Sequence, residues 1–352
     1  MFGPVLHNFS WQRPADRDGP RRLVVVDLGV DSTDVVTVSR VNGRLEWLAG
    51  ASLAKAGDDL HATAEQLTAE LKEHCADTPY VSILTGGRGG IVRLLTFPGQ
   101  PARSETLTQH VQQTLGVGAD YAVLQQVVRR MNEGEDAEYS VLAAALPYEE
   151  IDILEDIVVN AGLTPVTLVA EGIAAANLAE AEPEKLPEEG AVGFLRIRGS
   201  TSLLLLYDGN DLALARQFRV GADAIIESLM SAFDLDYETA RKLFNSGSFD
   251  FSGNISGDVS SWLHQISISL DFIERRYGHR AEPLYLLGPG QGTNVLCDVF
   301  SEAAGRKIEP WDVLGSLGGL EAPPGLAQSS ETYALALCEA VRIMNRGLEN
   351  EA

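Results

Sequence analysis

Residues 23–38 read Leu-Val-Val-Val-Asp-Leu-Gly-Val-Asp-Ser-Thr-Asp-Val-Val-Thr-Val, and their pattern recurs later in the chain. A β-branched apolar run ends at Asp27-Leu28-Gly29, small and polar residues follow, and a second β-branched run begins. The pattern predicts a strand, a tight polar turn and a second strand. Asn42-Gly43 indicates a hairpin turn into a third strand over residues 45–50. A dinucleotide-binding fold or a P-loop is disfavoured, because both place a helix after the glycine, where this chain continues as a strand.

The same pattern occurs a second time, between residues 191 and 218. A strand over 191–198 leads through Gly-Ser-Thr-Ser into a strand over 203–207, and Asp-Gly-Asn then turns into a strand over 212–218. Residues 220–223 open a helix with apolar residues on one face. Two copies so far apart in the sequence predict a duplicated lobe. Two unrelated antiparallel hairpins are the alternative.

Length and charge bound the classes of function. The chain has 352 residues, of which 45% are hydrophobic, enough for roughly two domains with sizeable cores. It carries 27 basic and 50 acidic residues, for a net charge of −23. Such a chain is repelled by nucleic acid and by anionic lipid, and it shows no uninterrupted basic patch. We therefore expect no nucleic-acid partner.

Cysteine usage and hydropathy indicate the compartment. The cysteines are odd in number and far apart in the sequence, at Cys75, Cys297 and Cys338. This spacing fits a reducing cytosol better than a disulfide framework, and the histidines show no metal-ligand spacing. The N-terminus lacks the apolar core of a signal peptide, and no apolar run approaches the ~20 residues of a membrane span. We expect a cytoplasmic protein without direct membrane insertion, and we expect no bound metal site built from histidines or cysteines.

The order of the remaining patterns predicts an α/β chain with four parts. Residues 1–20 read as a flexible leader, and residues 21–97 together with 327–352 as the core of a first lobe. Residues 98–168 read as an inserted α+β subdomain, and residues 169–326 as the second lobe. The duplicated strand–turn–strand pattern lies in the two lobes.

These features resemble the two-lobed, ribonuclease H-like duplicated fold of actin, heat-shock chaperones and sugar kinases. Within that fold, the chain is most similar to PilM-type proteins of type IV pilus assembly, which are cytoplasmic relatives of the cell-division protein FtsA. The first phosphate loop of that family, Asp-Ile-Gly-Ser-Ser-Ser, is matched by residues 27–32. The family phrase Ala-Gly-Leu-x-Pro, with a Glu six residues later, is matched by residues 161–171. Looser matches fall at 216–226 and 270–273, so that the resemblance covers about residues 23–345.

The resemblance implies a nucleotide cleft and names its residues. The matching positions are Asp27, Gly29, Ser32, Thr33, Glu171, Arg196, Gly199, Ser200, Thr201, Gly288, Gly290 and Gly292. ATP and Mg²⁺ are the cofactors it implies. For Asp27 the alternative is a turn-capping residue. For Glu171 we favour the alternative of an acidic residue stabilised at a helix N-terminus, and Ser200 and Thr201 also fit ordinary turn residues.

Departures from the family pattern predict a partly rewritten nucleotide site. ATP-binding relatives carry Asp-Ile-Gly where this chain has Arg196-Ile197-Arg198. That Asp helps to hold the hydrated metal, and that Gly lets backbone amides approach phosphate. Pro289 removes an amide from the adenosine loop, and Asp34 stands where a basic residue often closes the first loop. The loops could pair directly through opposite charges, Arg196 could neutralise phosphate itself, or the arginines could point to solvent. We expect no catalytic residues and disfavour an enzyme.

Three functions fit the resemblance. The first is a scaffold of a type IV pilus or related secretion platform. It would bind the cytoplasmic N-terminal tail of an inner-membrane protein of the PilN type, in a groove between the first lobe and the inserted subdomain. The second is an active ATPase or sugar kinase, against which position 196 counts, since a kinase needs its metal-holding carboxylates. The third is an FtsA-like division protein, but residues 342–352 are too acidic for an amphipathic membrane helix. Self-association stays open.

Overall fold

The structure is a computed structural model that describes residues 20–53, 59–75, 78–86, 90–99, 104–131, 137–246, 257–317, 320–327 and 330–349. The predicted leader, up to residue 19, lies outside the described residues. The chain forms two compact units. Unit 1 comprises Met1–Ala181 and Leu314–Ala352, and unit 2 comprises Glu182–Val313.

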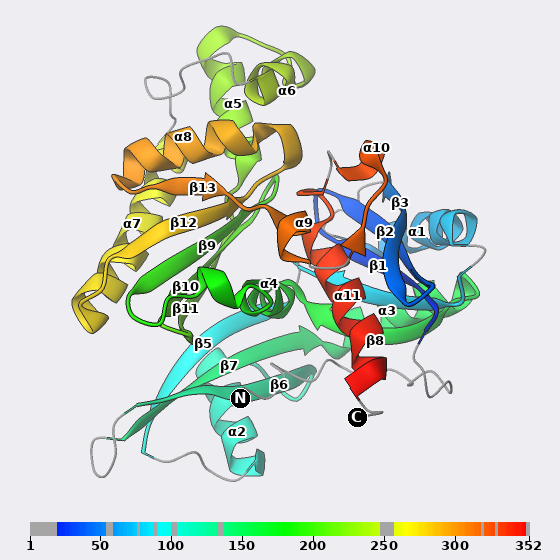
Figure 1. The fold of residues 1–352 in the computed structure, drawn as a ribbon, viewed down its shortest axis with the longest axis horizontal. Coiled ribbons are helices and arrows are strands. Elements are labelled where there is room, and N and C mark those ends of the chain that lie inside the picture. The colour runs from blue at the N-terminus through cyan, green and yellow to red at the C-terminus, as the bar shows by residue number, and fades with distance from the viewer. Residues whose placement is uncertain are drawn as a thin grey trace. The chain divides into compact units, whose positions relative to one another are not determined.

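Unit 1 is built on a six-stranded sheet with the strand order β14-β3-β2-β1-β4-β8 (Figure 1). Its strands are β1 (Arg22–Leu28), β2 (Thr33–Val41), β3 (Arg44–Leu53), β4 (Tyr80–Thr85), β8 (Thr164–Ala170) and β14 (Leu320–Glu321). β1, β2 and β3 pair antiparallel, whereas β4 runs parallel to β1 and to β8. Residues 23–28 are all buried, which explains why β1 is a continuous apolar run interrupted only by Asp27.

Helices cover both faces of this sheet. Val24 and Val26 of β1 share a core with helices α1 (Leu60–His74) and α3 (Tyr148–Asn160). Helices α4 (Glu171–Glu180) and α11 (Ala334–Glu349) pack on each other, and α11 also lies against β1 and β2. The buried Glu339 links α11 to the sheet, because its carboxylate accepts a hydrogen bond from Thr167 of β8 at 3.2 Å. It also accepts hydrogen bonds at 2.5 and 2.7 Å from Arg342, one turn further along α11.

A second sheet of unit 1 forms the inserted subdomain. Its strands follow the order β5-β7-β6, and helix α2 covers one face. These elements are β5 (Ile91–Pro98), α2 (Ser104–Leu115), β6 (Tyr121–Met131) and β7 (Glu138–Pro147). The predicted boundaries of 98–168 differ from this arrangement. β5 belongs to the inserted sheet, whereas α3 and β8 belong with the six-stranded sheet, because β8 pairs with β4. The local sequence of a strand does not reveal which other strand it pairs with.

Unit 2 contains a five-stranded sheet with the order β11-β10-β9-β12-β13. Its elements are η2 (Pro183–Lys185), β9 (Ala191–Ile197), β10 (Ser202–Asp208), β11 (Asp211–Phe218), α5 (Ala222–Phe233), α6 (Tyr237–Ser246), α7 (Gly257–Tyr277), β12 (Ala281–Leu287), η3 (Gly290–Gly292), α8 (Thr293–Ala304) and β13 (Ile308–Pro310). The short helices α9 (Val313–Ser316) and α10 (Pro324–Ala327) follow. The predicted second lobe began at residue 169, but unit 2 begins at Glu182, because α4 packs with α11 in unit 1.

The two faces of this sheet carry different side chains. Leu195 and Leu204 join Trp262 of α7 and Phe300 of α8 in a large apolar core. The opposite face is aromatic, where Phe194 meets Tyr207, Tyr285 and Trp311 with ring centroids 4.6–5.7 Å apart. On this side the buried Glu182 accepts hydrogen bonds from the Trp311 indole and from Lys185.

The predicted duplication is confirmed. In each unit, three consecutive strands pair antiparallel, β1–β2–β3 and β9–β10–β11, and a later strand lies parallel to the first, β4 beside β1 and β12 beside β9. Among the described residues, no helix is both long enough and apolar enough to span a bilayer.

Candidate functional site

The first polar turn closes through its backbone. The Gly29 N–H donates to the Ser32 carbonyl at 2.9 Å, so the chain reverses within four residues between β1 and β2. Thr33, the first residue of β2, is fully buried, and its hydroxyl has no hydrogen-bond partner within the described residues. Gly29, Ser32 and Thr33 therefore lie together at one turn, as predicted from their adjacency.

Asp27 lies inside β1, one residue before the strand ends. It is paired with Asp34 of β2, so both side chains leave the same face of the sheet, and both are almost fully buried. Asp34 accepts hydrogen bonds from Ser32 at 2.9 Å and from Ser52 at 2.6 Å. Two neighbouring carboxylates disfavour each other in the charged form, and these hydroxyls offset part of that cost for Asp34.

Tyr333, in the turn before α11, interacts with Ser52 and Asp34. Burial raises the pKa of the Tyr333 phenol, its hydrogen bond with Ser52 lowers it, and the charge of Asp34 raises it. The Tyr333 ring also packs against Gly50 of β3, where an added Cβ would lie 3.1 Å from the ring. Asp34 thus belongs to a buried network of hydroxyl groups, which sequence analysis did not identify.

Gly86 and Glu171 directly follow the carboxyl ends of β4 and β8 in the six-stranded sheet. Because β1, β4 and β8 are parallel, their carboxyl ends meet at one edge, where ligands of open α/β sheets commonly bind. The Gly86 N–H donates to Leu28 at 3.3 Å, and a Cβ added to Gly86 would lie 2.1 Å from Glu171 Oε2. Glu171 is the buried first residue of α4 and lies directly after β8. Sequence analysis did not select Gly86, although a glycine that directly follows an apolar strand was its signal.

The second polar turn repeats the first. The Arg198 N–H donates to the Thr201 carbonyl at 2.8 Å, and Ser202 begins β10. Arg196 lies inside β9, where it is paired with Leu203 of β10 and Leu287 of β12. Its exposed fraction is 7%, and that of Arg198 is 8%. The alternative in which both arginines point to solvent is therefore wrong. Arg196 lies within the predicted strand over 191–198, one residue before the end of β9.

The start of helix α5 packs tightly on this turn. The N–H groups of Ala222 and Asp223 donate to the carbonyls of Arg198 and Gly199 at 2.8 and 2.9 Å. A Cβ added to Gly221 would lie 2.2 Å from the Arg198 carbonyl oxygen, so only glycine allows this approach. Free amides at a helix N-terminus bind anions well. Here two of those amides are already used by the chain itself.

The glycines after β12 serve internal packing. A Cβ on Gly288 would lie 2.6 Å from Thr293 Oγ1, which donates to the Gly290 carbonyl at 2.7 Å. Gly290 has a φ of +67°, a conformation that favours glycine. A Cβ on Gly292 would lie 2.3 Å from the ring of Phe244, which α6 buries there. An aromatic side chain thus fills the space beside the predicted adenosine loop.

These observations test whether the residues fit ATP and Mg²⁺. The loop of unit 1 keeps a carboxylate and glycines, which suit a hydrated metal. The loops of unit 2 do not fit, because arginines replace the carboxylate and the glycine, the amides of α5 are engaged, and Phe244 fills the side of Gly292. Within the described chain, no group of three or more His, Cys, Asp or Glu side chains is placed to hold a metal ion.

Comparison with solved structures identifies the fold. A chain of the structure described as the PilM–PilN type IV pilus biogenesis complex superposes with a TM-score of 0.75, at 20% identity, over 92% of this chain and 98% of that chain. This chain has the actin-like fold of PilM. The ethanolamine utilization protein EutJ from Carboxydothermus hydrogenoformans, which shares the actin-like fold, superposes with a TM-score of 0.51, at 14% identity, over 92% of this chain and 90% of that one.

The likeness is visible in the structure and not in sequence comparisons. No protein-family model matches the chain, and no curated protein sequence matches it. The resemblance to PilM-type proteins that short phrases suggested is confirmed at the level of the fold. The predicted two-lobed α/β architecture with an inserted subdomain in the first lobe is likewise an actin-like one.

Proposed function

We propose that this protein is a PilM-like scaffold of a type IV pilus or related secretion platform. In this role it binds the cytoplasmic N-terminal tail of a PilN-type inner-membrane protein, and that partner holds it at the membrane. The observation that carries the proposal is the superposition on one chain of the PilM–PilN complex structure. The superposition covers 92% of this chain and 98% of that chain. Active ATPases and kinases of this fold require the metal-holding carboxylates that Arg196 replaces, so we favour a scaffold.

The inserted sheet offers a surface for an extended tail. On the face opposite α2, Leu94 of β5 and Gln126 of β6 lie on either side of Leu142 of β7, in one cross-strand row. Leu124 lies next to this row, and Leu94 and Leu124 are both partly exposed. An extended peptide can place alternate side chains on such a row, while edge strands offer backbone groups for pairing.

Helix α4 forms one wall of the proposed groove. A Cβ added to Gly172 would lie 2.8 Å from Val92 Cγ1, so β5 and the start of α4 are in direct contact. Val92 belongs to the same face of the inserted sheet as Leu94 and Leu142, because its partner in β7 is Ala144. In this proposal the tail lies on this apolar face of the inserted sheet, beside α4, where Leu94 and Leu124 are partly exposed and Val92 and Leu142 are buried beneath. The buried Gly172 permits the close approach of α4 and β5.

We also propose that the nucleotide site is degenerate. The remnant consists of Asp27, Gly29, Ser32, Thr33 and Glu171 in unit 1 and of Arg196, Gly199, Ser200, Thr201, Gly288, Gly290 and Gly292 in unit 2. The internal use of the α5 amides and the packing of Phe244 on Gly292 support this proposal. In this proposal, glycines that match the family's adenosine loop serve the packing of the chain itself, as Gly288 does beside Thr293 and Gly292 beside Phe244.

The tail proposal is tested with a labelled peptide that carries the cytoplasmic N-terminal residues of the PilN-type protein encoded in the same genome. Fluorescence anisotropy of the peptide against the full chain should show saturable binding. Leu124→Glu should weaken it at least tenfold, because a charge would be buried under the peptide. Gln109→Glu, on the exposed side of α2, adds the same charge to the same subdomain and should leave binding unchanged. Equal binding by both variants, or no binding by the native chain, would refute the proposal.

A further inference from the structure

The outer face of α7 carries an apolar pair beside a hollow. Helix α7 buries Trp262, Ile266 and Leu270 in the core of unit 2, yet Ile268 and Phe272, one turn apart, are 48% and 45% exposed. They line a hollow of about 390 Å³ together with Asp271, Arg275 and Arg276. Two adjacent exposed apolar side chains form one continuous apolar patch, whereas single exposed ones are ordinary on soluble proteins.

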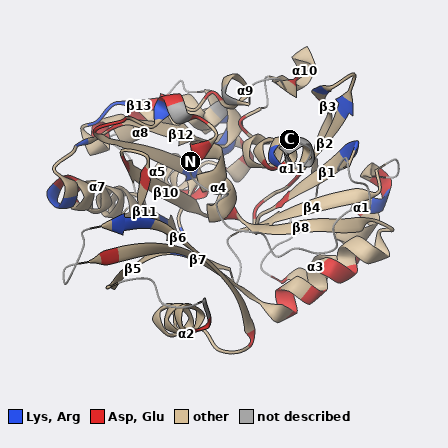
Figure 2. Cartoon of the chain, turned by 60° about the horizontal axis from the view of Figure 1, so that its bottom comes forward, with Lys and Arg blue, Asp and Glu red and all other residues tan. Residues whose placement is uncertain are grey.

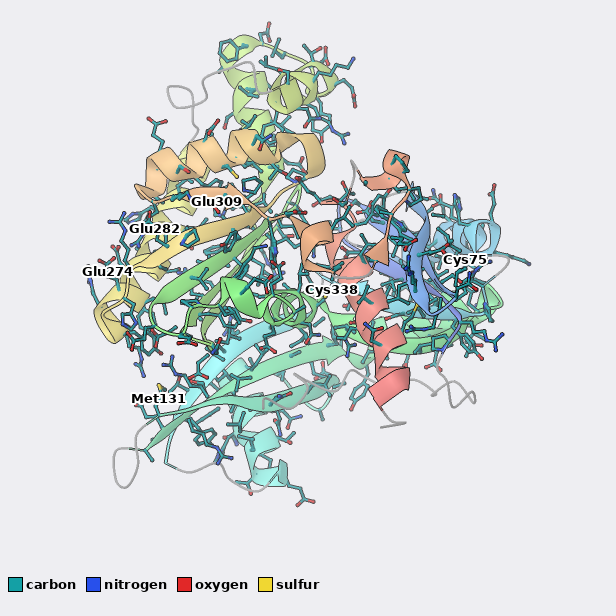
Figure 3. The ribbon with its side chains drawn as sticks, in the orientation of Figure 1. Cys75, Met131, Glu274, Glu282, Glu309 and Cys338 are labelled. Atoms are coloured by element: carbon teal, nitrogen blue, oxygen red, sulfur yellow. The ribbon has the colours of Figure 1, made fainter. Side chains whose placement is uncertain are left out.

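The C-terminal end of this helix has a cation, Arg275, that is not ion-paired within the part of the chain that the structure describes. Neighbouring cations are paired with acidic residues, Arg306 with Glu274 at 2.9 Å, Arg280 with Glu282 at 2.9 Å, and Lys307 with Glu309. Figure 3 labels these three glutamates. Arg275 makes no ion pair with any residue that the structure describes. In a chain with a net charge of −23, an apolar surface that ends in a free arginine is complementary to an acidic, apolar helix.

Helix α3 has that complementary character. Tyr148 and Val159, at the two ends of its outer face, are 50% and 54% exposed. Asp152 and Glu155 lie between them, so the four residues follow the spacing i, i+4, i+7 and i+11 of a single helical stripe. Neither Asp152 nor Glu155 forms an ion pair within the described residues. Figure 2 shows acidic residues along α3 and basic residues at one end of α7.

We propose that the outer face of α3 in one copy of this protein binds the outer face of α7 in a second copy. On each helix, an exposed apolar residue is followed by a charged residue at the same distance along the helix. Tyr148 and Glu155 are seven residues apart, as are Ile268 and Arg275, which corresponds to about 10.5 Å along each helix. One apolar contact in the hollow and one ion pair with Arg275 can therefore form together.

The proposed contact joins two different surfaces, so it is heterologous. Each copy offers one α3 face and one α7 face, and copies therefore add head to tail into open chains or rings. A single pair of helices buries less than the ~1,000 Å² of a stable interface, so the association is weak and concentration-dependent. Its ionic part falls as salt screens the charges. The inference does not depend on the proposed pilus function.

Sedimentation velocity of the full chain tests the proposal. At low salt, about 50 mM, the mean sedimentation coefficient should rise as protein concentration rises, and about 500 mM salt should suppress the rise. Arg275→Glu and Glu155→Arg should each stay monomeric, because each variant places like charges at its own junction. An equimolar mixture of the two should associate again, because every junction between unlike copies regains opposite charges.

Matched controls place the same charge changes elsewhere on the surface. Glu65→Arg on α1 and Arg241→Glu on α6 alter exposed residues and should associate like the native chain. Circular dichroism confirms that each variant is folded. A native chain that stays monomeric at low salt, single variants that associate as the native chain does, or a mixture that stays monomeric would each overturn the proposal.

Discussion

Gly29 and Arg198 close the same turn in the two halves of the molecule. Each donates its backbone N–H to the carbonyl three residues later, Gly29 to Ser32 at 2.9 Å and Arg198 to Thr201 at 2.8 Å. The equivalence extends two residues back, where Asp27 of β1 corresponds to Arg196 of β9. The two units therefore share the backbone of this turn, whereas the strand before it carries an acidic residue in unit 1 and a basic residue in unit 2.

This difference in charge leads to a prediction about ATP. Calorimetric titration of the chain with ATP and Mg²⁺ should show no micromolar binding, and no steady release of phosphate should follow. The reason is that Arg196 replaces a metal-holding carboxylate and that the α5 amides already serve Arg198 and Gly199. An ATP-binding protein of the same fold serves as the positive control. Micromolar binding together with phosphate release would show that the second loop does support a nucleotide.

Gly221 provides a test of the packing at the second loop. Gly221→Ala should lower the free energy of unfolding by about 2 kcal/mol, because the new methyl group meets backbone oxygens of Arg198 and Gly199 that cannot rotate away. Urea unfolding measures the change. Gly257→Ala is the matched control, since no atom lies within 4 Å of its added Cβ, and it should stay within about 0.5 kcal/mol of the native chain. Equal effects would contradict this account of the α5 start.

Glu180, the last residue of α4, should make stability depend on pH. Burial raises the pKa of its carboxyl from 4.5 to about 7. The unfolded chain loses this proton near pH 4.5 and the folded chain only near pH 7, so the ionised group destabilises the folded state above pH 7. The penalty shrinks as the pH falls from 7 to 4.5 and is absent below that range.

Glu180→Gln should therefore raise the free energy of unfolding by about 1–2 kcal/mol at pH 8 and by much less at pH 5. Urea unfolding at the two pH values measures this difference. Glu188→Gln, at an exposed position in the same stretch of chain, should show no such dependence. A stabilisation by Glu180→Gln that is the same at both pH values would mean that the carboxyl does not titrate near neutral pH.

The three cysteines should be unreactive in the folded chain. Cys75, Cys297 and Cys338 are all buried, and burial raises the pKa of the Cys75 thiol to about 11 (Figure 3). The thiolate is the reactive form, so a chromogenic disulfide reagent should label the native protein slowly and reach three thiols per chain only after denaturation. Rapid labelling of the native protein would show that at least one of these thiols is exposed.

The strands could be predicted because their apolar runs are nearly continuous. Residues 23–28 and 203–207 are apolar apart from Asp27 and the hydroxyl of Tyr207, and they are buried, so that local composition and final position agree. The boundaries of 98–168 could not be predicted correctly, because the choice of β4 as partner of β8 depends on residues about 80 positions away. Periodicity identifies a strand but does not identify the sheet to which it belongs.

The candidate site was predictable at its turns and not in its surroundings. Gly29, Ser32 and Thr33 are consecutive or nearly so, and a local turn brings them together. Gly86 meets Glu171 only because β4 and β8 end at the same edge, and Phe244 meets Gly292 only because α6 folds back onto η3. These contacts depend on tertiary packing, which a single sequence does not display.

The inserted subdomain begins and ends at one place. Ile91, its first strand residue, is paired with Ala145 near the end of β7, and a Cβ on the preceding Gly90 would lie 2.9 Å from Leu146. α3 then starts at Tyr148 without an intervening loop. Because the chain leaves and re-enters the six-stranded sheet at neighbouring positions, the length and sequence of the segment can change while β4 and β8 remain paired.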